Sequence, residues 1–190
     1  MRAVVVYESM YGNTRAIAEA IATGLGERVD VTVLHADDAN AEAIKGTDLV
    51  VVGGPTHMHG LSTSLSRRAA AQATEEDGHG HLEPHAGDSA GLRSWLAHFS
   101  GTGLLAAAFD TRLDRSAALT GAAARGIARR LRRQGCTLVA KPESFFVIDG
   151  EGPLEDGEVA RACAWGAALA THIPPEALSS VSPNREGAQR

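Results

Sequence analysis

The sequence is poor in aromatic residues, cysteine and basic charge, and each shortage excludes a class of protein. Aromatic residues make up 4% of the 190 residues, so aliphatic side chains and alanine must fill most of the core. The two cysteines, Cys136 and Cys163, have no metal-type spacing and are expected to be free thiols. A formal net charge of −5 gives no support for a nucleic-acid partner, which would favour a basic surface.

Long apolar runs are also missing. No run approaches the ~18 residues that a membrane span needs. The N-terminus lacks the basic-then-apolar pattern of a secretory signal, because its apolar run is only a short strand. We therefore expect a cytoplasmic protein with no membrane partner.

What the chain does contain is an alternation of strand and helix patterns. Continuous apolar runs such as 48–52 and 104–109 are typical of parallel strands covered by helices on both faces. The pattern predicts an α/β fold with a parallel sheet. The expected strands are 3–7, 29–35, 48–52 and 104–109, followed by 137–140 and 145–148, which are either one interrupted strand or a strand with an extension.

Helices are expected between these strands, each with one apolar face. The first begins after the loop at 8–14 and ends near 24–26, a short one covers 40–45, and one at 92–99 returns the chain to the fourth strand. Ser116 is expected to cap a helix that runs to about Gln134, and a last helix covers about 155–172. The residues expected to face inward are Ile17, Ala18, Ile21, Leu25, Leu119, Ala123, Ile127, Leu131, Val159, Ala162, Gly166 and Leu169.

The chain length predicts one domain, over residues 1–173, and a flexible C-terminal tail at 174–190. Residues 62–91 form a long loop insertion, rich in Ser, Gly and His, after the third strand. Its histidines, His79, His81 and His85, are predicted to lie in an exposed loop, because no strand or helix would fix them as metal ligands.

The most informative segment is the loop Glu8–Thr14, between the first strand and the first helix. Ser9 and Thr14 supply hydroxyl groups, Gly12 permits close backbone approach, and Asn13 and Thr14 open the helix with free N–H groups. The loop has no lysine, so it is not a nucleotide-hydrolysis loop of the GxxxxGK[ST] type. It predicts a site for a phosphate monoester, with an ordinary helix N-cap as the alternative.

This loop, YESMYGNT, resembles the FMN-phosphate loop of the flavodoxin family, although Tyr11 stands where the family has a second hydroxyl residue. Gly53–Gly60 resembles the loop that lies against the isoalloxazine ring, and residues 109–114 take the place of the third FMN loop. Together with residues 151–166, the resemblance covers about residues 2–172. It implies a doubly wound three-layer sandwich whose five-stranded parallel sheet has the order 2-1-3-4-5, with FMN bound non-covalently.

The resemblance places the phosphate in the first loop and the ring between the other two. Gly60 would ease the turn of a backbone carbonyl toward flavin N5, which the family uses after one-electron reduction. The loops lack the Trp or Tyr that many flavodoxins place on the ring. The cofactor-binding residues implied in this way are Ser9, Met10, Tyr11, Gly12, Asn13, Thr14, Pro55, Thr56, His57, Met58, His59, Gly60, Phe109, Asp110, Thr111 and Arg112.

Two residues of the third loop keep alternative interpretations. Phe109 is either a ring contact or the last inward residue of its strand. Arg112 either approaches the reduced ring or pairs with Asp110 or Asp114 on the surface.

The arginines at 125, 129, 130, 132 and 133 crowd the end of one helix, where cations complement the helix dipole. They form either a solvated face or a docking patch for an acidic redox partner. Trp95 and Trp165 are expected to pack helices onto the sheet.

The function that the resemblance implies is electron transfer between a reductase and an acceptor protein. The flavin carries the chemistry, and no side chain is predicted to be catalytic. An FMN-dependent NAD(P)H:quinone-type reductase and a binding module of the same fold without flavin are the alternatives.

Overall fold

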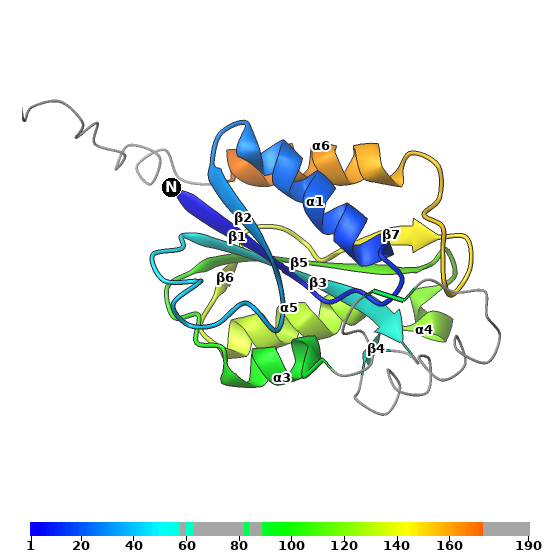
Figure 1. Cartoon of the computed structure of the whole chain (residues 1–190), viewed down its shortest axis with the longest axis horizontal. Coiled ribbons are helices and arrows are strands. Elements are labelled where there is room, and N and C mark those ends of the chain that lie inside the picture. Colours follow the sequence, from blue (N-terminus) through cyan, green and yellow to red (C-terminus); the bar gives the residue numbers. More distant parts are fainter. Residues whose placement is uncertain (58–59, 63–81, 84–88, 173–190) are drawn as a thin grey trace, which may run out of the picture.

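The protein forms three layers, with a central parallel sheet between two pairs of helices (Figure 1). The computed structural model describes residues 1–57, 60–62, 82–83 and 89–172. Helices α1 (Asn13–Gly26) and α6 (Glu158–Thr171) cover one face of the sheet. Helices α3 (Gly91–His98) and α5 (Ala123–Arg133) cover the other, and the short α4 (Ala117–Thr120) precedes α5.

The central sheet has the predicted strand order. Its strands are β1 (Arg2–Tyr7), β2 (Asp30–His35), β3 (Leu49–His57), β5 (Leu105–Leu113), β6 (Thr137–Leu138) and β7 (Glu143–Val147), and all of their pairings are parallel. The order β2-β1-β3-β5-β6, with β7 also on β5, is the predicted 2-1-3-4-5. The two-residue β4 (Gly60–Leu61) turns back antiparallel onto the end of β3.

The fifth strand is interrupted, which was one of the two alternatives left by its sequence. β6 and β7 both pair with β5, and residues 139–142 separate them. Pro142 lies in this break, where a residue without an N–H cannot donate to a ladder.

Two apolar clusters, one on each face of the sheet, form the core. The inward residues predicted for α1, namely Ile17, Ala18, Ile21 and Leu25, are all fully buried beneath α6 and against the sheet. On the other face, Ile127 and Leu131 of α5 are buried against β3 and β5. Trp165 packs against the first cluster and Trp95 against the second, as predicted.

Three local predictions were wrong. Residues 41–46 form turns and not a helix: Asn40 caps a first turn, but the next backbone hydrogen bonds, from Lys45 to Glu42 and from Thr47 to Ile44, are of the i,i+3 type. The helix expected from Ser116 to Gln134 breaks at Gly121, whose φ of 78° is left-handed. Val159 lies at the start of α6 on its outer side and is 51% exposed.

Candidate functional site

The carboxyl ends of three neighbouring strands meet at one edge of the sheet. Tyr7 of β1 pairs with Gly53 of β3, and Gly53 pairs with Phe109 of β5, so the segments that follow these residues share that edge. In sheets of this kind ligands bind beyond the carboxyl ends, where the strand order reverses. Here the reversal lies between β1 and β3.

The loop between β1 and α1 has a free helix N-terminus. Gly12 has a left-handed φ of 84° and is the N-cap of α1, and no side chain of the described residues caps the helix. The first intrahelical bond runs from Ala16 N–H to the Gly12 carbonyl at 2.9 Å. No described residue accepts a hydrogen bond from the N–H of Asn13, Thr14 or Arg15. Three donors with a partial positive charge are therefore available to an anion.

The hydroxyl groups of this loop are buried and already bonded. Ser9 is 2% exposed, and its Oγ accepts the Gly12 N–H at 3.1 Å. Thr14, also 2% exposed, shares a 2.7 Å hydrogen bond with Thr111 Oγ1 on β5. The Asn13 side chain donates to the Glu151 carbonyl at 2.8 Å. These bonds fix the loop to β5 and to the segment before α6.

A carboxylate from the insertion lies beside the same loop. The Glu83 N–H donates to the Met10 carbonyl at 2.7 Å. Its carboxylate lies 3.3 Å from the Arg15 guanidinium, and a Cβ added at Gly12 would meet it at 3.4 Å. Glu83 of the insertion therefore lies beside the first loop, while most of residues 62–91 lie outside the described residues.

Comparison with known proteins agrees with this geometry. Residues 4–72 match the family model described as flavodoxin domain. A flavodoxin of Aquifex aeolicus is 34% identical over 68 residues, which are 35% of this chain and 37% of that relative. Over residues 4–72 the chain is therefore similar to the flavodoxin family. The matched segment contains the first loop and β3, so the sequence evidence for the family comes from this part of the chain.

Solved flavodoxins share the whole fold. A flavodoxin from the domain Archaea has a TM-score of 0.61 at 23% identity, covering 90% of this chain and 97% of its own. Oxidised flavodoxin 1 of Bacillus cereus has a TM-score of 0.62 at 20% identity, covering 91% of this chain and 99% of its own. The flavodoxin fold therefore extends well beyond the segment matched in sequence.

Thr56, a predicted FMN ligand in the second loop, is hydrogen-bonded to other parts of the fold. Thr56 Oγ1 donates to Asp110 Oδ2 at 2.8 Å and accepts the Ala123 N–H at 2.8 Å, so it caps α5. Pro55 and Gly60 are partly exposed nearby. Met58, His59 and the side chain of His57 lie outside the described residues.

The third flavodoxin loop was predicted at 109–114, but β5 continues to Leu113, so the predicted ligands at 109–112 lie in a strand and not in a loop. Phe109 is fully buried, and its ring packs edge-on against Phe145 and Trp165. A Cβ at Gly53 would lie 2.1 Å from that ring, so glycine is required where β3 passes it. The core interpretation of Phe109 is the correct one.

Asp110 and Arg112 also serve the fold. Asp110 is fully buried, and its Oδ2 accepts the Ala124 N–H of α5 at 2.9 Å. The Arg112 guanidinium donates to the carbonyls of Leu113 and Arg115 and lies 5.0 Å from the centre of the Phe146 ring. Within the described residues it forms no ion pair, so the predicted pairing with Asp110 or Asp114 is wrong.

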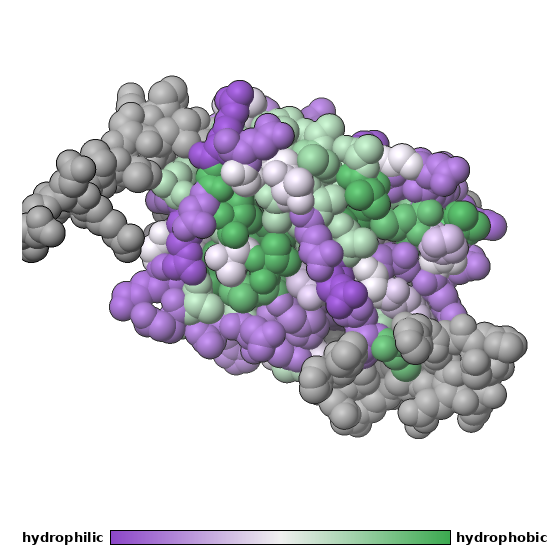
Figure 2. All heavy atoms as spheres, turned by 45° about the horizontal axis from the view of Figure 1, so that its top comes forward, coloured by the Kyte–Doolittle hydropathy of each residue, from purple (hydrophilic) through white to green (hydrophobic). Residues whose placement is uncertain are grey.

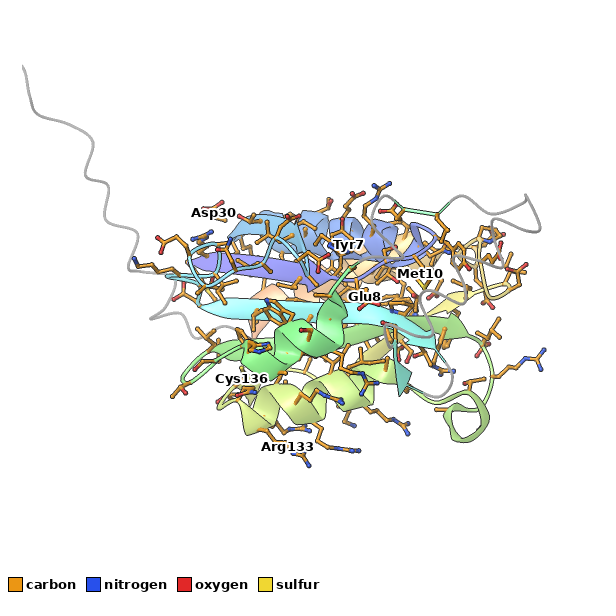
Figure 3. All side chains as sticks on the ribbon, turned by 60° about the horizontal axis from the view of Figure 1, so that its bottom comes forward. Tyr7, Glu8, Met10, Asp30, Arg133 and Cys136 are labelled. Carbon is orange, nitrogen blue, oxygen red and sulfur yellow. The ribbon has the colours of Figure 1, made fainter. Side chains whose placement is uncertain are left out.

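Glu8 also belongs to the site, although its sequence position was not predicted to do so. Its carboxylate is 1% exposed, accepts the Leu92 N–H at 2.6 Å, and is hydrogen-bonded to the Ser62 hydroxyl. Figure 3 shows Glu8 beside Met10, where β1 ends. Glu8 therefore ties the first loop to both ends of the insertion. The feature of the sequence that could have indicated this role is a carboxylate that comes directly after an apolar strand.

The described part of the chain contains no cluster of His, Cys, Asp and Glu that fits a metal ion. His79, His81 and His85 lie outside it. Among the described helices, none combines the length and the apolar character that crossing a membrane requires. Both cysteines are free, and burial raises the pKa of Cys136 to about 11.

Proposed function

We propose that this protein binds FMN and transfers electrons between two redox partner proteins, a reductase and an acceptor, in the cytoplasm. The observation that carries the proposal is the uncapped N-terminus of α1, with Gly12 in a left-handed conformation and two buried hydroxyl groups around it. The similarity of residues 4–72 to a flavodoxin domain supports the choice of a flavin phosphate as the anion.

The residues present fit a phosphate group. The amides of Asn13, Thr14 and Arg15 point to no described acceptor, and Ser9 and Thr14 hold hydroxyl groups beside them. Amides at a helix N-terminus bind a dianion through both hydrogen bonds and the helix dipole. FMN, when bound, supplies one- or two-electron redox chemistry, while the chain binds and orients it.

Pro55 and Gly60 of the second loop are partly exposed, and they are the described residues of that loop that we propose to contact the ring. Thr56, Phe109, Asp110 and Arg112 are already engaged in the fold, and we omit them from the proposed site. Thr111 contributes indirectly, by holding Thr14.

The phosphate role of Thr14 is tested with two isosteric variants. Thr14→Val and Thr111→Val both remove the hydrogen bond between these residues, so the loss of stability from that bond is the same in both variants. Only Thr14→Val also removes the phosphate contact, and we expect it to weaken FMN binding by about 1–3 kcal/mol. Affinity is measured by flavin fluorescence quenching, with riboflavin as the ligand that lacks the phosphate.

The expected result is a loss of preference for FMN over riboflavin in Thr14→Val alone. An equal loss in both variants would mean that the hydroxyl pair is structural. If the wild-type protein binds neither FMN nor riboflavin at micromolar concentration, the chain is a flavin-free module of this fold.

Measuring turnover distinguishes the electron carrier from the alternative, an FMN-dependent quinone-type reductase. Flavin-loaded protein is mixed with NAD(P)H and a quinone in the absence of any reductase. A carrier shows slow turnover under these conditions, whereas fast turnover would establish a quinone-type reductase and overturn the carrier function.

A further inference from the structure

Helix α5 presents a row of arginines that the fold itself does not use. Its sequence, Ala123–Arg133, contains five arginines and no acidic residue. At 3.6 residues per turn, four of them lie within an arc of about 100° on the outer side of the helix. These four exposed residues, which we call the α5 basic face, are Arg125, Arg129, Arg132 and Arg133.

The buried side of the same helix is apolar. Ala124, Ile127, Ala128 and Leu131 are fully or almost fully buried against the sheet. Figure 3 shows the labelled Arg133 on the opposite side, pointing away from the sheet. The arginines are therefore not required to build the core.

The helix dipole accounts for only part of this charge. Cations stabilise the last turn of a helix, which contains Arg130, Arg132 and Arg133. Arg125 instead lies in the first turn, near the positive end of the dipole. In addition, Arg125 and Arg129, and Arg129 and Arg133, are spaced i, i+4, where like charges destabilise a helix. A purely structural role does not explain these residues.

No carboxylate offsets the charge within the described part of the chain, where none of the five arginines forms an ion pair. Arg130 donates only to the Gly126 carbonyl, at 3.2 Å. Burial, followed by the positive charges of Arg93, Arg129 and Arg133, lowers the pKa of Arg130. Five of the 18 basic residues are thus concentrated on one helix of a chain with 23 acidic ones.

We propose that the α5 basic face is a docking surface for the acidic surface of a protein partner. The row spans about 12 Å along the helix, since each residue rises about 1.5 Å. This length fits the few carboxylates of a protein patch. Arginine forms paired, fork-like hydrogen bonds with carboxylates, which favours this anion at an exposed site.

Larger polyanions fit less well. A DNA duplex or an anionic membrane extends past the row by more than a Debye length of about 8 Å and meets the rest of a chain with net charge −5. Insertion into a membrane also needs exposed apolar residues beside the basic ones. Neither exposed large hydrophobic residue of the described part lies on α5: Ile148 directly follows β7, and Val159 lies on α6, across the sheet.

The docking surface is joined to the cofactor edge through the start of α5. Thr56 caps Ala123 and Asp110 caps Ala124, both at 2.8–2.9 Å, so α5 is anchored to the ends of β3 and β5. Arg125 follows within one turn. The Arg125 end of the row therefore lies near the edge of the sheet where the strands end, whereas Arg133 lies toward the opposite edge, beside residues 101–104. Docking itself does not require the flavin.

The test uses two synthetic helical peptides of about 20 residues, a length at which isolated helices form. In one, glutamates at i, i+4 and i+8 form a row that matches the arginines. In the other, the same glutamates are spread around the helix. Binding to the full chain is measured by fluorescence anisotropy at low and at physiological salt.

The variant Arg129→Gln with Arg133→Gln removes two charges from the row, and glutamine keeps the helix propensity. The control, Arg28→Gln with Lys141→Gln, removes two exposed charges elsewhere. We expect the row peptide to bind the wild type and the control equally, and the α5 variant about tenfold more weakly at low salt. Equal thermal unfolding of the variants confirms that the fold is retained.

Three results would overturn the proposal. One is equal binding of the row peptide by all three proteins, and another is equal affinity of the wild type for both peptides. The third is binding of duplex DNA or phosphatidylserine vesicles, lost in the α5 variant, without binding of the row peptide.

Discussion

At the scale of single residues, the local sequence puts the polar groups of the site into one loop. It does not determine which residues those groups bond to. Gly12, Ser9 and Thr14 are positioned by the loop itself, whereas their partners come from distant segments. Thr111 and Glu83 are 97 and 71 residues away from Thr14 and Gly12, respectively, as their numbers show. The balance of charge at the loop is therefore a tertiary property.

Glu83 is expected to oppose phosphate binding, because its carboxylate lies beside Gly12 and pairs with Arg15. We predict that Glu83→Gln increases the preference for FMN over riboflavin by about 0.5–1 kcal/mol. Glu19→Gln is the matched control, since Glu19 also contacts Arg15, at 3.7 Å, but is 61% exposed. Flavin titration measures both variants, and an equal effect of the two would contradict the specific role of Glu83.

At the scale of elements, the contact between α1 and α6 depends on two glycines. A Cβ at Gly24 would lie 1.9 Å from the Cys163 carbonyl, and one at Gly166 would lie 2.2 Å from the Ile21 carbonyl. The helix backbones therefore approach too closely for any side chain at these positions. The sequence shows the glycines but does not show that they face each other.

We predict that Gly24→Ala destabilises the protein by at least about 3 kcal/mol, because overpacking forces the two helices apart. Gly26→Ala, in the same helix with open space around it, should be neutral or stabilising by up to about 1 kcal/mol. Urea unfolding compares the two variants. Similar stability of both would show that α1 and α6 adjust to the added methyl group at little cost.

At the scale of the whole molecule, an ion-pair network fastens the last helix to the sheet. Glu158 is 7% exposed, accepts the Phe146 N–H at 2.7 Å, and binds Arg161. Arg161 also reaches Glu143 and lies 4.4 Å from the centre of the Phe145 ring. Burial alone would raise the pKa of Glu158, but the bonds from Arg161 and Phe146 and the charge of Arg161 lower it below its ordinary value of 4.5.

Because the pKa is lower in the folded state, ionised Glu158 stabilises the protein above about pH 4.5, and this contribution is lost as the pH falls through the folded pKa. We predict that Glu158→Gln costs about 1–3 kcal/mol at pH 7 and clearly less at pH 3. Asp156→Asn, at an exposed neighbour, is the control. Denaturant unfolding at both pH values measures the difference, and a cost independent of pH would contradict the assigned charge.

Figure 2 views the molecule with the side of α1 and α6 brought forward, where apolar patches lie among polar side chains. Helix α5, which carries the α5 basic face, lies on the other side of the sheet (Figure 1). The side of α1 and α6 therefore carries exposed apolar patches, whereas α5 carries a row of arginines, and the proposed docking uses the α5 side.

The sequence by itself determined the parallel α/β fold and the buried faces of α1 and α5, and it predicts an anion site in the loop at 8–14. Strand and helix periodicity, together with the free amides that follow a short glycine-containing loop, are local properties. The order of the strands came from family resemblance, and the structure confirmed it.

Only the tertiary structure decided the roles of Thr56, Phe109, Asp110 and Arg112, because each depends on what lies across the sheet. β5 extends past residue 109, which places Phe109 in the core and turns Asp110 toward the start of α5. Glu8 likewise acquires its role from Ser62 and Leu92, at the two ends of the insertion, and Glu83 is a residue of the insertion that lies against the first loop. Local patterns determine which groups a loop offers, whereas long-range packing determines which of them remain available to a ligand.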